Sequence, residues 1–248
     1  MATTRNLPTT LHGFQNMIDG IYGTSVALLY SRKQLVLILY RFLGLTARVT
    51  RKSKAKSSRE SRKIILDLFR WYLCFCNFVG LDAADILWEK YPNVCPYCFA
   101  RRKCDCEDRP HELKGPSLPA YRQRKGRPRS IRSWQRMFRR IYGETNAKRG
   151  EEYTFRRLLE EVTEVLDLTL PRITNINNFK MEMADVGARI FSLATFWKLI
   201  YRASCFSGTE AFVQTVQKQF VLLAGIFGQT DLKLGEYRAG GYQNSGLF

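Results

Sequence analysis

The sequence is short of the features that mark membrane, secreted and β-rich proteins. Its most apolar stretch, Leu35 to Leu45, is interrupted by Arg41 and is too short to cross a bilayer. The N-terminal residues lack the apolar region of a secretory signal, and convincing runs of alternating strand pattern are missing. We therefore expect a cytoplasmic, all-α protein with no membrane partner. Its 45% hydrophobic and 13% aromatic residues are enough to form a core.

Acidic residues are also scarce, and the imbalance is local. The 248 residues contain 22 Asp and Glu against 40 Lys and Arg, a net charge of +18. Residues 48–63 and 122–140 carry 16 of these 18 net charges. Such segments favour an anionic partner, with nucleic acid among the candidates. The alternative is solvated charge on a loop and on a helix face.

An internal repeat organises the chain. At an offset of 120, Leu11–Gly23 lies over Ile131–Gly143, with identical residues at five positions. At an offset of 118, Leu66–Phe69 lies over Ala184–Gly187. A repeat that keeps its offset predicts two copies of one structural unit.

Apolar residues recur at helical spacing in each copy. The predicted helices are Leu11–Ile21, Leu35–Leu45, Ile64–Phe78 and Ala83–Trp88, then Ile131–Ile141, Phe155–Leu168, Phe179–Tyr201 and Ala211–Phe227. Gly23 and Gly143 are predicted to end the first helix of each copy. The predicted domains are a helical unit 1–92, a cysteine segment 93–108, a basic linker 109–129 and a helical unit 130–248.

Two pairs of acids stand out in the second copy. Glu161 and Glu164 are three residues apart on one predicted helix, and Glu182 and Asp185 on the next. Acids three apart project from one face, so antiparallel packing would bring four carboxylates together. An all-oxygen site of this kind selects Mg²⁺ or Mn²⁺. The alternative is that these acids only mark solvated helix faces.

This pattern resembles a known family. Glu161-x-x-Glu164 followed by Glu182-x-x-Asp185, within Glu-Met-Ala-Asp-Val-Gly-Ala-Arg-Ile-Phe-Ser-Leu-Ala, resembles the motif of the MazG-like all-α nucleoside triphosphate pyrophosphatases. The match covers most of the second half. The segment from Gly80 to Cys98 is similar to the tail of MazG-like proteins that end in a small cysteine cluster.

The resemblance implies Mg²⁺-dependent hydrolysis of a nucleoside triphosphate at the α–β phosphate bond, with release of a nucleoside monophosphate and pyrophosphate. It implies that Glu161, Glu164, Glu182 and Asp185 hold the metal, and that Glu160 orients or deprotonates the attacking water, with Glu161 also part of the catalytic set. The residues expected to bind substrate phosphates are Lys180, Arg189, Arg157 and Lys148.

The chain departs from the family in two respects. The downstream basic and amide residues of the family are not evident after Phe196. In the first copy, the positions of the acids hold Tyr40, Arg41, Gly44 and Ile64, and only Asp67 is retained, opposite Asp185. One carboxylate cannot hold a divalent ion, so the first copy is predicted to be inactive.

Two functions follow from these features. The first is a pyrophosphatase in which a fused duplication forms a pseudo-dimer with one active site, open to further homo-oligomerisation. The alternative is a non-catalytic nucleotide- or nucleic-acid-binding protein on a MazG-like scaffold.

Four of the seven cysteines lie within twelve residues, at Cys95, Cys98, Cys104 and Cys106. Four thiolates at this spacing suit a closed tetrahedral Zn²⁺ site, and a small zinc knuckle is predicted. Unligated cysteines on a loop are the alternative. Cys74, Cys76 and Cys205 stand in apolar surroundings and are predicted core residues, while His12 and His111 are isolated.

Overall fold

The computed structural model describes residues 8–51, 59–104, 106, 126–170 and 175–199. The chain divides into two compact units, Met1–Phe206 and Ser207–Phe248, and every described residue belongs to the first unit. The predicted helix Ala211–Phe227, Cys205 and His111 lie outside the described residues, as does most of the predicted linker 109–129.

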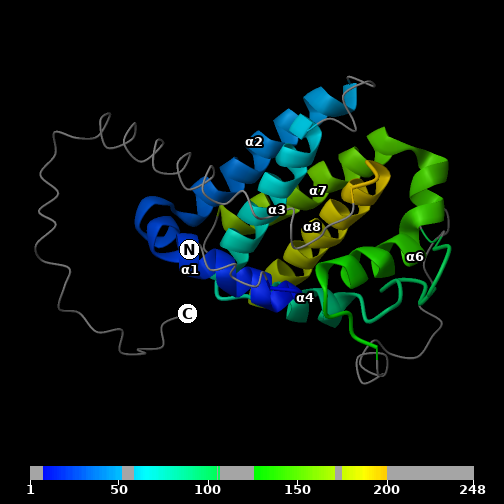
Figure 1. The fold of residues 1–248 in the computed structure, drawn as a ribbon, viewed down its shortest axis with the longest axis horizontal. Coiled ribbons are helices and arrows are strands. Elements are labelled where there is room, and N and C mark those ends of the chain that lie inside the picture. Colours follow the sequence, from blue (N-terminus) through cyan, green and yellow to red (C-terminus); the bar gives the residue numbers. More distant parts are fainter. Residues whose placement is uncertain (1–7, 52–58, 105, 107–125, 171–174, 200–248) are drawn as a thin grey trace, which may run out of the picture. The chain divides into compact units, whose positions relative to one another are not determined.

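Helices make up most of the described residues (Figure 1). They are α1 (Leu11–Leu29), α2 (Arg32–Arg51), α3 (Arg59–Phe78), α4 (Ala83–Lys90), α6 (Ile131–Arg149), α7 (Glu151–Thr169) and α8 (Ile176–Phe196). Within this part of the chain, the one extended pairing is an isolated antiparallel bridge between Thr10 and Ser130. The predicted all-α class is confirmed.

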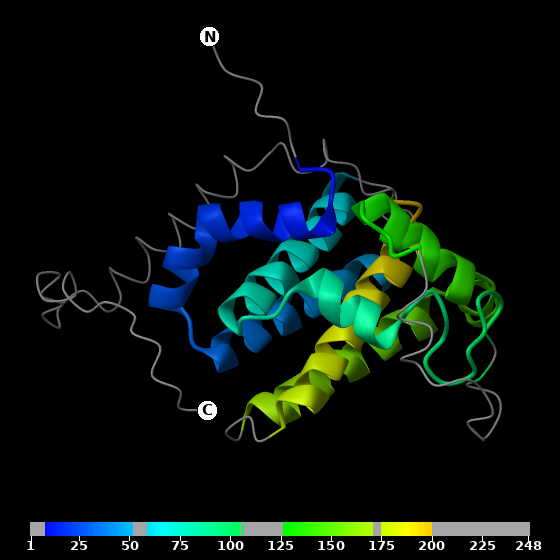
Figure 2. The same cartoon turned by 90° about the horizontal axis from the view of Figure 1, so that it is seen from below.

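Four of the helices form a bundle that draws one helix pair from each half of the sequence. α2 packs on α3, and α7 packs on α8. The two pairs meet where α3 contacts α8 and α2 contacts α7. Figures 1 and 2 show α3 and α8 side by side in the middle of the described helices, with α1 and α6 outside them. The core therefore lies along the α3–α8 contact.

Aromatic side chains and one glycine form this contact. Phe69 meets Phe191 edge to face, with ring centroids 5.4 Å apart. Gly187 of α8 lies so close to α3 that a Cβ atom there would sit 2.6 Å from the hydroxyl oxygen of Tyr72. Since real Cβ atoms essentially never come that close, α3 and α8 can approach this closely only because residue 187 is glycine.

The two halves begin in equivalent ways. α1 and α6 start and end at positions 120 residues apart. Thr10 and Ser130 precede these helices, and each side chain accepts a hydrogen bond from the backbone N–H three residues later, as an N-cap does. The same two residues also pair with each other in the β-bridge. The starts of the two halves therefore lie side by side.

A second matched contact links the first helix of each half to the residues that follow its third helix. The Gln15 side chain donates a hydrogen bond to the carbonyl oxygen of Leu81 at 2.6 Å. The Gln135 side chain makes the same bond to the carbonyl oxygen of Leu199. The glutamines are 120 residues apart and the leucines 118, which are the two offsets of the sequence repeat. The halves thus share a buried tertiary contact as well as helix lengths.

The predicted helix ends at Gly23 and Gly143 are wrong. Both glycines lie inside helices, and α1 and α6 continue for six more residues to Leu29 and Arg149. A glycine inside a helix costs about 1 kcal/mol relative to alanine, and packing after it offsets that cost because later residues such as Val26 are buried. In α6 the terminating role falls to Gly150, whose φ of 92° lies in a region open mainly to glycine.

Among the described residues, no single helix is both long enough and apolar enough to cross a membrane. α3 and α4 together are long and apolar enough for a membrane span, but the chain bends by 95° between them.

Candidate functional site

Three carboxylates from two helices converge in the second half. Glu161 of α7 and Glu182 and Asp185 of α8 each place a carboxylate oxygen within 4.8 Å of the others. Glu182 also shares a side-chain hydrogen bond with Glu164. Glu161 and Asp185 are buried, Glu182 is half-buried and Glu164 is exposed. We call these four residues the acidic cluster, which is buried at one end and open to solvent at the other.

The cluster holds protons unusually well. Burial raises the pKa of Glu161 to about 7, and Asp185 adds to the rise while Arg189 and Arg157 oppose it. Burial also raises the pKa of Glu182 to about 7, with further contributions from the hydrogen bond to Glu164 and the charge of Asp185. Carboxylates this close repel when both are ionised. Positive charge at the cluster, whether protons or a cation, would relieve this repulsion.

Basic side chains neutralise part of this charge. The Arg189 Nε lies 3.1 Å from a Glu161 carboxylate oxygen, and an Arg157 guanidinium nitrogen lies 3.3 Å from the same oxygen. On the other side, the Lys90 ammonium and the Tyr91 hydroxyl both donate to the buried Asp185 carboxylate. Lys90 and Tyr91 come from the end of α4, in the first half of the sequence.

The other predicted site residues lie nearer the surface. Glu160 is exposed and pairs with Arg157 through its own carboxylate. Lys180 is half-buried and lies two residues before Glu182 on α8. Lys148 is exposed in the last turn of α6. In the described part of the chain, neither lysine forms an ion pair with the acidic cluster.

The first half lacks an equivalent of the acidic cluster among the described residues. Asp67, which corresponds to Asp185, is buried and forms ion pairs with Lys63 at 2.7 Å and Arg70 at 2.6 Å. Arg41, at the position of Glu161, is exposed. A carboxylate with two cationic partners and no acidic neighbour has no excess charge to offer a metal ion.

A second candidate metal centre is the group of four thiols predicted from the sequence. The Sγ atoms of Cys95, Cys98, Cys104 and Cys106 lie close together. The distances are 3.5 Å from Cys95 to Cys106, 3.5 Å from Cys98 to Cys104 and 3.1 Å from Cys104 to Cys106. These are separate thiols, since a disulfide bond is about 2.05 Å long. Sulfur atoms around a tetrahedral Zn²⁺ would lie roughly 3.8 Å apart, given a Zn–S bond of about 2.3 Å. A cysteine group that can hold a metal is thus present.

The thiols are anchored to α6. The backbone N–H of Cys104 donates to the carbonyl oxygen of Ile141 at 2.9 Å. Hydrogen bonds from Cys104 and Cys106 lower the pKa of Cys95, and a hydrogen bond between the Tyr142 hydroxyl and the Cys95 thiol adds to this fall. Three of the four cysteines are buried and Cys98 is exposed. The loop that carries them is therefore held against the second half of the chain.

The remaining cysteines and His12 have structural surroundings. Cys74 and Cys76 are buried in α3, as predicted for core residues, and burial raises the pKa of Cys74 to about 12. The His12 ring hydrogen-bonds to Asp82, the N-cap residue of α4. None of these three residues contributes to either candidate metal centre.

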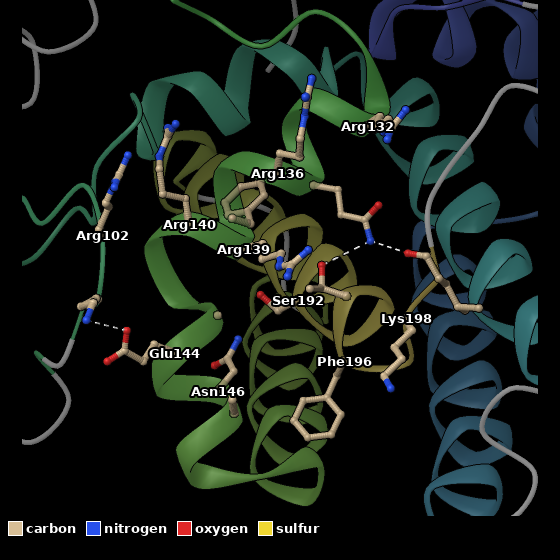
Figure 3. Close-up of a pocket in the computed structure, with 17 residues that line it drawn as sticks. Arg102, Arg132, Arg136, Arg139, Arg140, Glu144, Asn146, Ser192, Phe196 and Lys198 are labelled. Carbon is tan, nitrogen blue, oxygen red and sulfur yellow. Dashed lines mark hydrogen bonds and ion pairs between the residues drawn. The ribbon is translucent and has the colours of Figure 1, made fainter.

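The two basic segments lie on different helices. The described part of 48–63 covers the end of α2 and the start of α3, where Arg48 pairs with Glu60 at 2.9 Å. The described part of 122–140 runs into α6, and four of its arginines line a surface cavity of about 900 Å³ (Figure 3). Only the second segment forms part of this cavity.

Comparisons with protein-family models, with curated proteins and with solved structures found no match for this chain. The arrangement of residues therefore carries the functional argument: an all-α protein with an acidic cluster between α7 and α8 and a group of four thiols beside α6.

Proposed function

We propose that the acidic cluster binds Mg²⁺ or Mn²⁺ and that the protein hydrolyses nucleoside triphosphates at the α–β phosphate bond. The observation that carries this proposal is the convergence of Glu161 from α7 with Glu182 and Asp185 from α8, whose carboxylate oxygens lie within 4.8 Å of one another. Glu164 completes the set through its bond to Glu182.

The donor chemistry fits a hard divalent cation. All four candidate ligands are carboxylates, and ions of this class prefer oxygen ligands. The raised pKa values of Glu161 and Glu182 support the same interpretation, because burial makes a lone negative charge costly there and the neighbouring carboxylates add to that cost, which a bound cation would relieve. When bound, the ion would supply positive charge to the phosphates and lower the pKa of water.

The chain's own residues have distinct roles in this proposal. Arg157 and Arg189 flank Glu161, and we propose that they hold phosphate oxygens once an ion satisfies that carboxylate. Glu160 is exposed beside Arg157 and can orient or deprotonate a water molecule. Lys180 and Lys148 are proposed as further phosphate contacts, Lys180 as a neighbour of Glu182 on α8 and Lys148 from the end of α6.

The first half contributes to the same site in this proposal. We interpret the chain as two MazG-like four-helix units in a pseudo-dimer, of which only the second retains its acids. The matched contacts of Gln15 and Gln135 support the duplication. Lys90 and Tyr91 reach Asp185 from the first half, so the inactive unit forms one wall of the active one.

The cysteine group is proposed as a structural zinc knuckle. Three buried thiols and one exposed thiol leave little room for a substrate, as in closed sites with four protein ligands. Its hydrogen bonds to α6 give it a role in fixing the segment between the two units.

The catalytic proposal is tested by incubating the pure protein with Mg²⁺ and a panel of ribonucleoside and deoxyribonucleoside triphosphates. Pyrophosphate release is expected, and Glu161→Gln should abolish it. Glu152→Gln is the matched control, because Glu152 is an exposed acid on the same helix. Absence of release with every substrate, or equal loss in both variants, would remove the enzyme proposal.

One observation favours a second candidate function. Lys90, Arg157 and Arg189 supply three positive charges to four acids, which leaves less demand for a metal ion. A protein that binds nucleotides without cleaving them would suit this balance. Saturable triphosphate binding by calorimetry, with no pyrophosphate release from a panel that includes every common base, would favour this candidate.

A further inference from the structure

A basic groove lies apart from the acidic cluster, between α6 and the C-terminal end of α8 (Figure 3). Four arginines of α6 line it: Arg132, Arg136, Arg139 and Arg140. Arg102 and Lys103 from the cysteine loop and Lys198 after α8 complete the positive lining. All seven side chains are exposed. Glu144 is the one acid in the lining, and it pairs with Lys103 at 3.2 Å.

Most of this charge is unneutralised. In the described part of the chain, Arg132, Arg136 and Arg139 have no carboxylate partner. Arg140 donates to the Asn93 side chain, a neutral group. A cavity lined by one sign of charge concentrates ions of the opposite sign. The groove therefore attracts an anion with several charges.

The arginines form a row as long as a few phosphates of a nucleic-acid strand. Arg132, Arg136 and Arg140 lie at successive turns of α6. Eight residues of helix extend about 12 Å, at about 1.5 Å per residue. Neighbouring arginines of this row are therefore about 6 Å apart along the helix axis. One strand of a duplex carries a phosphate per roughly 3.4 Å of axis, and phosphates are further apart along an unstacked single strand, so the row spans a few phosphates.

The repeat provides an internal comparison. At the offset of 120, the four arginines of α6 correspond to His12, Asn16, Asp19 and Gly20 of α1. α1 has the same length as α6, the same kind of N-cap and an equivalent buried glutamine. The arginines are therefore not required to form or pack this helix. Four cations within nine residues also repel one another, which indicates that a ligand and not the fold accounts for them.

The groove also offers an aromatic side chain. Phe196, at the last position of α8, is half-buried and lines the cavity together with Ser192 and Thr195 (Figure 3). Grooves that bind single-stranded nucleic acid combine cations along the backbone with aromatic side chains on which bases stack.

We propose that this groove binds a single-stranded nucleic acid, with its phosphates on Arg132, Arg136 and Arg140 and a base against Phe196. The proposal goes beyond the hydrolysis proposed above and does not depend on it. Binding involves neither the acidic cluster nor a divalent ion.

The test is fluorescence anisotropy with fluorescein-labelled 20-nucleotide oligo(dT) and oligo(U), without added Mg²⁺ or triphosphate, over a range of salt concentrations. The groove variant is Arg132→Gln/Arg136→Gln. The matched control, Arg32→Gln/Lys33→Gln, removes the same charge from exposed positions on α2. A third variant, Phe196→Leu, removes the aromatic ring and leaves the net charge unchanged.

We expect the wild-type protein to bind and the groove variant to bind on the order of tenfold more weakly at low salt. The slope of log K against log salt should fall by about 1.4, since each lost phosphate contact removes about 0.7 for a single strand. Phe196→Leu should weaken binding by about fivefold or more, with the salt slope unchanged. The control should match the wild type.

Three outcomes would overturn the proposal. The first is no binding to either oligonucleotide. The second is equal weakening in the groove variant and the control, which would reduce the effect to net charge. The third is displacement of the oligonucleotide by polyglutamate of equal length at the same concentration as by unlabelled oligonucleotide, which would make the groove a surface for acidic protein. Arg132→Lys/Arg136→Lys should restore most of the binding and shows that the variant chain folds.

Discussion

Lys90, in the first half of the sequence, donates a hydrogen bond to Asp185, in the second half. Both side chains are about nine-tenths buried. Burial by itself lowers the pKa of Lys90, but the adjacent Asp185 carboxylate more than compensates, and the net effect is a raised pKa. Lys90 is therefore protonated at neutral pH, and its bond to Asp185 joins α4 to the acidic cluster on α8.

Removing one member of this pair should destabilise the protein. Lys90→Met leaves Asp185 buried with only the Tyr91 hydroxyl as a close donor. Breaking a buried pair from one side costs about 3 kcal/mol. We expect a loss of this size in the free energy of unfolding measured by urea denaturation. Lys63→Met is the control, because its ammonium is exposed although it also pairs with an aspartate.

The double variant Lys90→Met/Asp185→Leu sharpens the measurement. Because it leaves no unpaired buried charge, it should be more stable than Lys90→Met alone. If the double variant loses as much as the sum of the two single variants, the ion pair is not the source of the effect.

The acidic cluster predicts that the stability of the folded protein in metal-free buffer falls as the pH rises. The pKa values of Glu161 and Glu182 rise from 4.5 to about 7 on folding. The folded state thus binds more protons than the unfolded state between these values, and its stability falls as pH rises through this window. The destabilisation is absent below the unfolded value and complete above about pH 7.

Thermal melts at pH 5.5 and pH 7.5 test this prediction. Glu161→Gln/Glu182→Gln should melt with a smaller fall in Tm between the two pH values than the wild type. Millimolar Mg²⁺ should raise the wild-type Tm at pH 7.5 and much less at pH 5.5, because protons compete with the ion. Glu60→Gln/Glu152→Gln, both at exposed positions, should behave as the wild type. Equal pH responses in the two double variants would contradict the assignment.

The sequence was informative where structure is local. Helical periodicity located the seven described helices, and three-residue spacing placed Glu182 and Asp185 on one face of α8. Antiparallel packing of two neighbouring helices was then enough to bring Glu161 to them. These features depend on residues near each other in the chain or on adjacent helices.

Contacts between distant segments were not predictable in this way. Lys90 and Tyr91 reach Asp185 from more than ninety residues away, and no periodic pattern singles them out. The arginines of 122–140 were visible as a basic segment, but Arg102 and Lys198 join them only through the fold. The helix ends at Gly23 and Gly143 were misassigned because glycine's local preference was weaker than the packing of the residues after it.

The cysteine group predicts one bound zinc ion per chain. Cys98→Ser should reduce the zinc content measured by mass spectrometry and lower the Tm, because the loop carries hydrogen bonds to α6. Cys74→Ala is the control, since Cys74 is buried in α3 and absent from the group. It should lose some stability from the deleted side chain but keep its zinc. A full zinc content in Cys98→Ser, or none in the wild type, would exclude the site.

The matched glutamines predict that the Gln15 side chain is required for the stability of the first half. Gln15 is buried, and its amide donates to the Leu81 carbonyl and to the Asn77 side chain at 2.8 Å. Its carbonyl oxygen accepts from the backbone N–H of Ala83 at 2.7 Å. Gln15→Leu would leave the buried backbone groups at 81 and 83 without this partner, and each such group costs about 1–3 kcal/mol. We expect a loss of at least about 2 kcal/mol in urea denaturation, whereas Asn16→Leu on the exposed face of α1 should change stability little. Because Lys90 and Tyr91 of the first half contact Asp185, Gln15→Leu should also weaken Mg²⁺ stabilisation at pH 7.5. If the variant loses stability but keeps the full Mg²⁺ effect, the first half does not support the site.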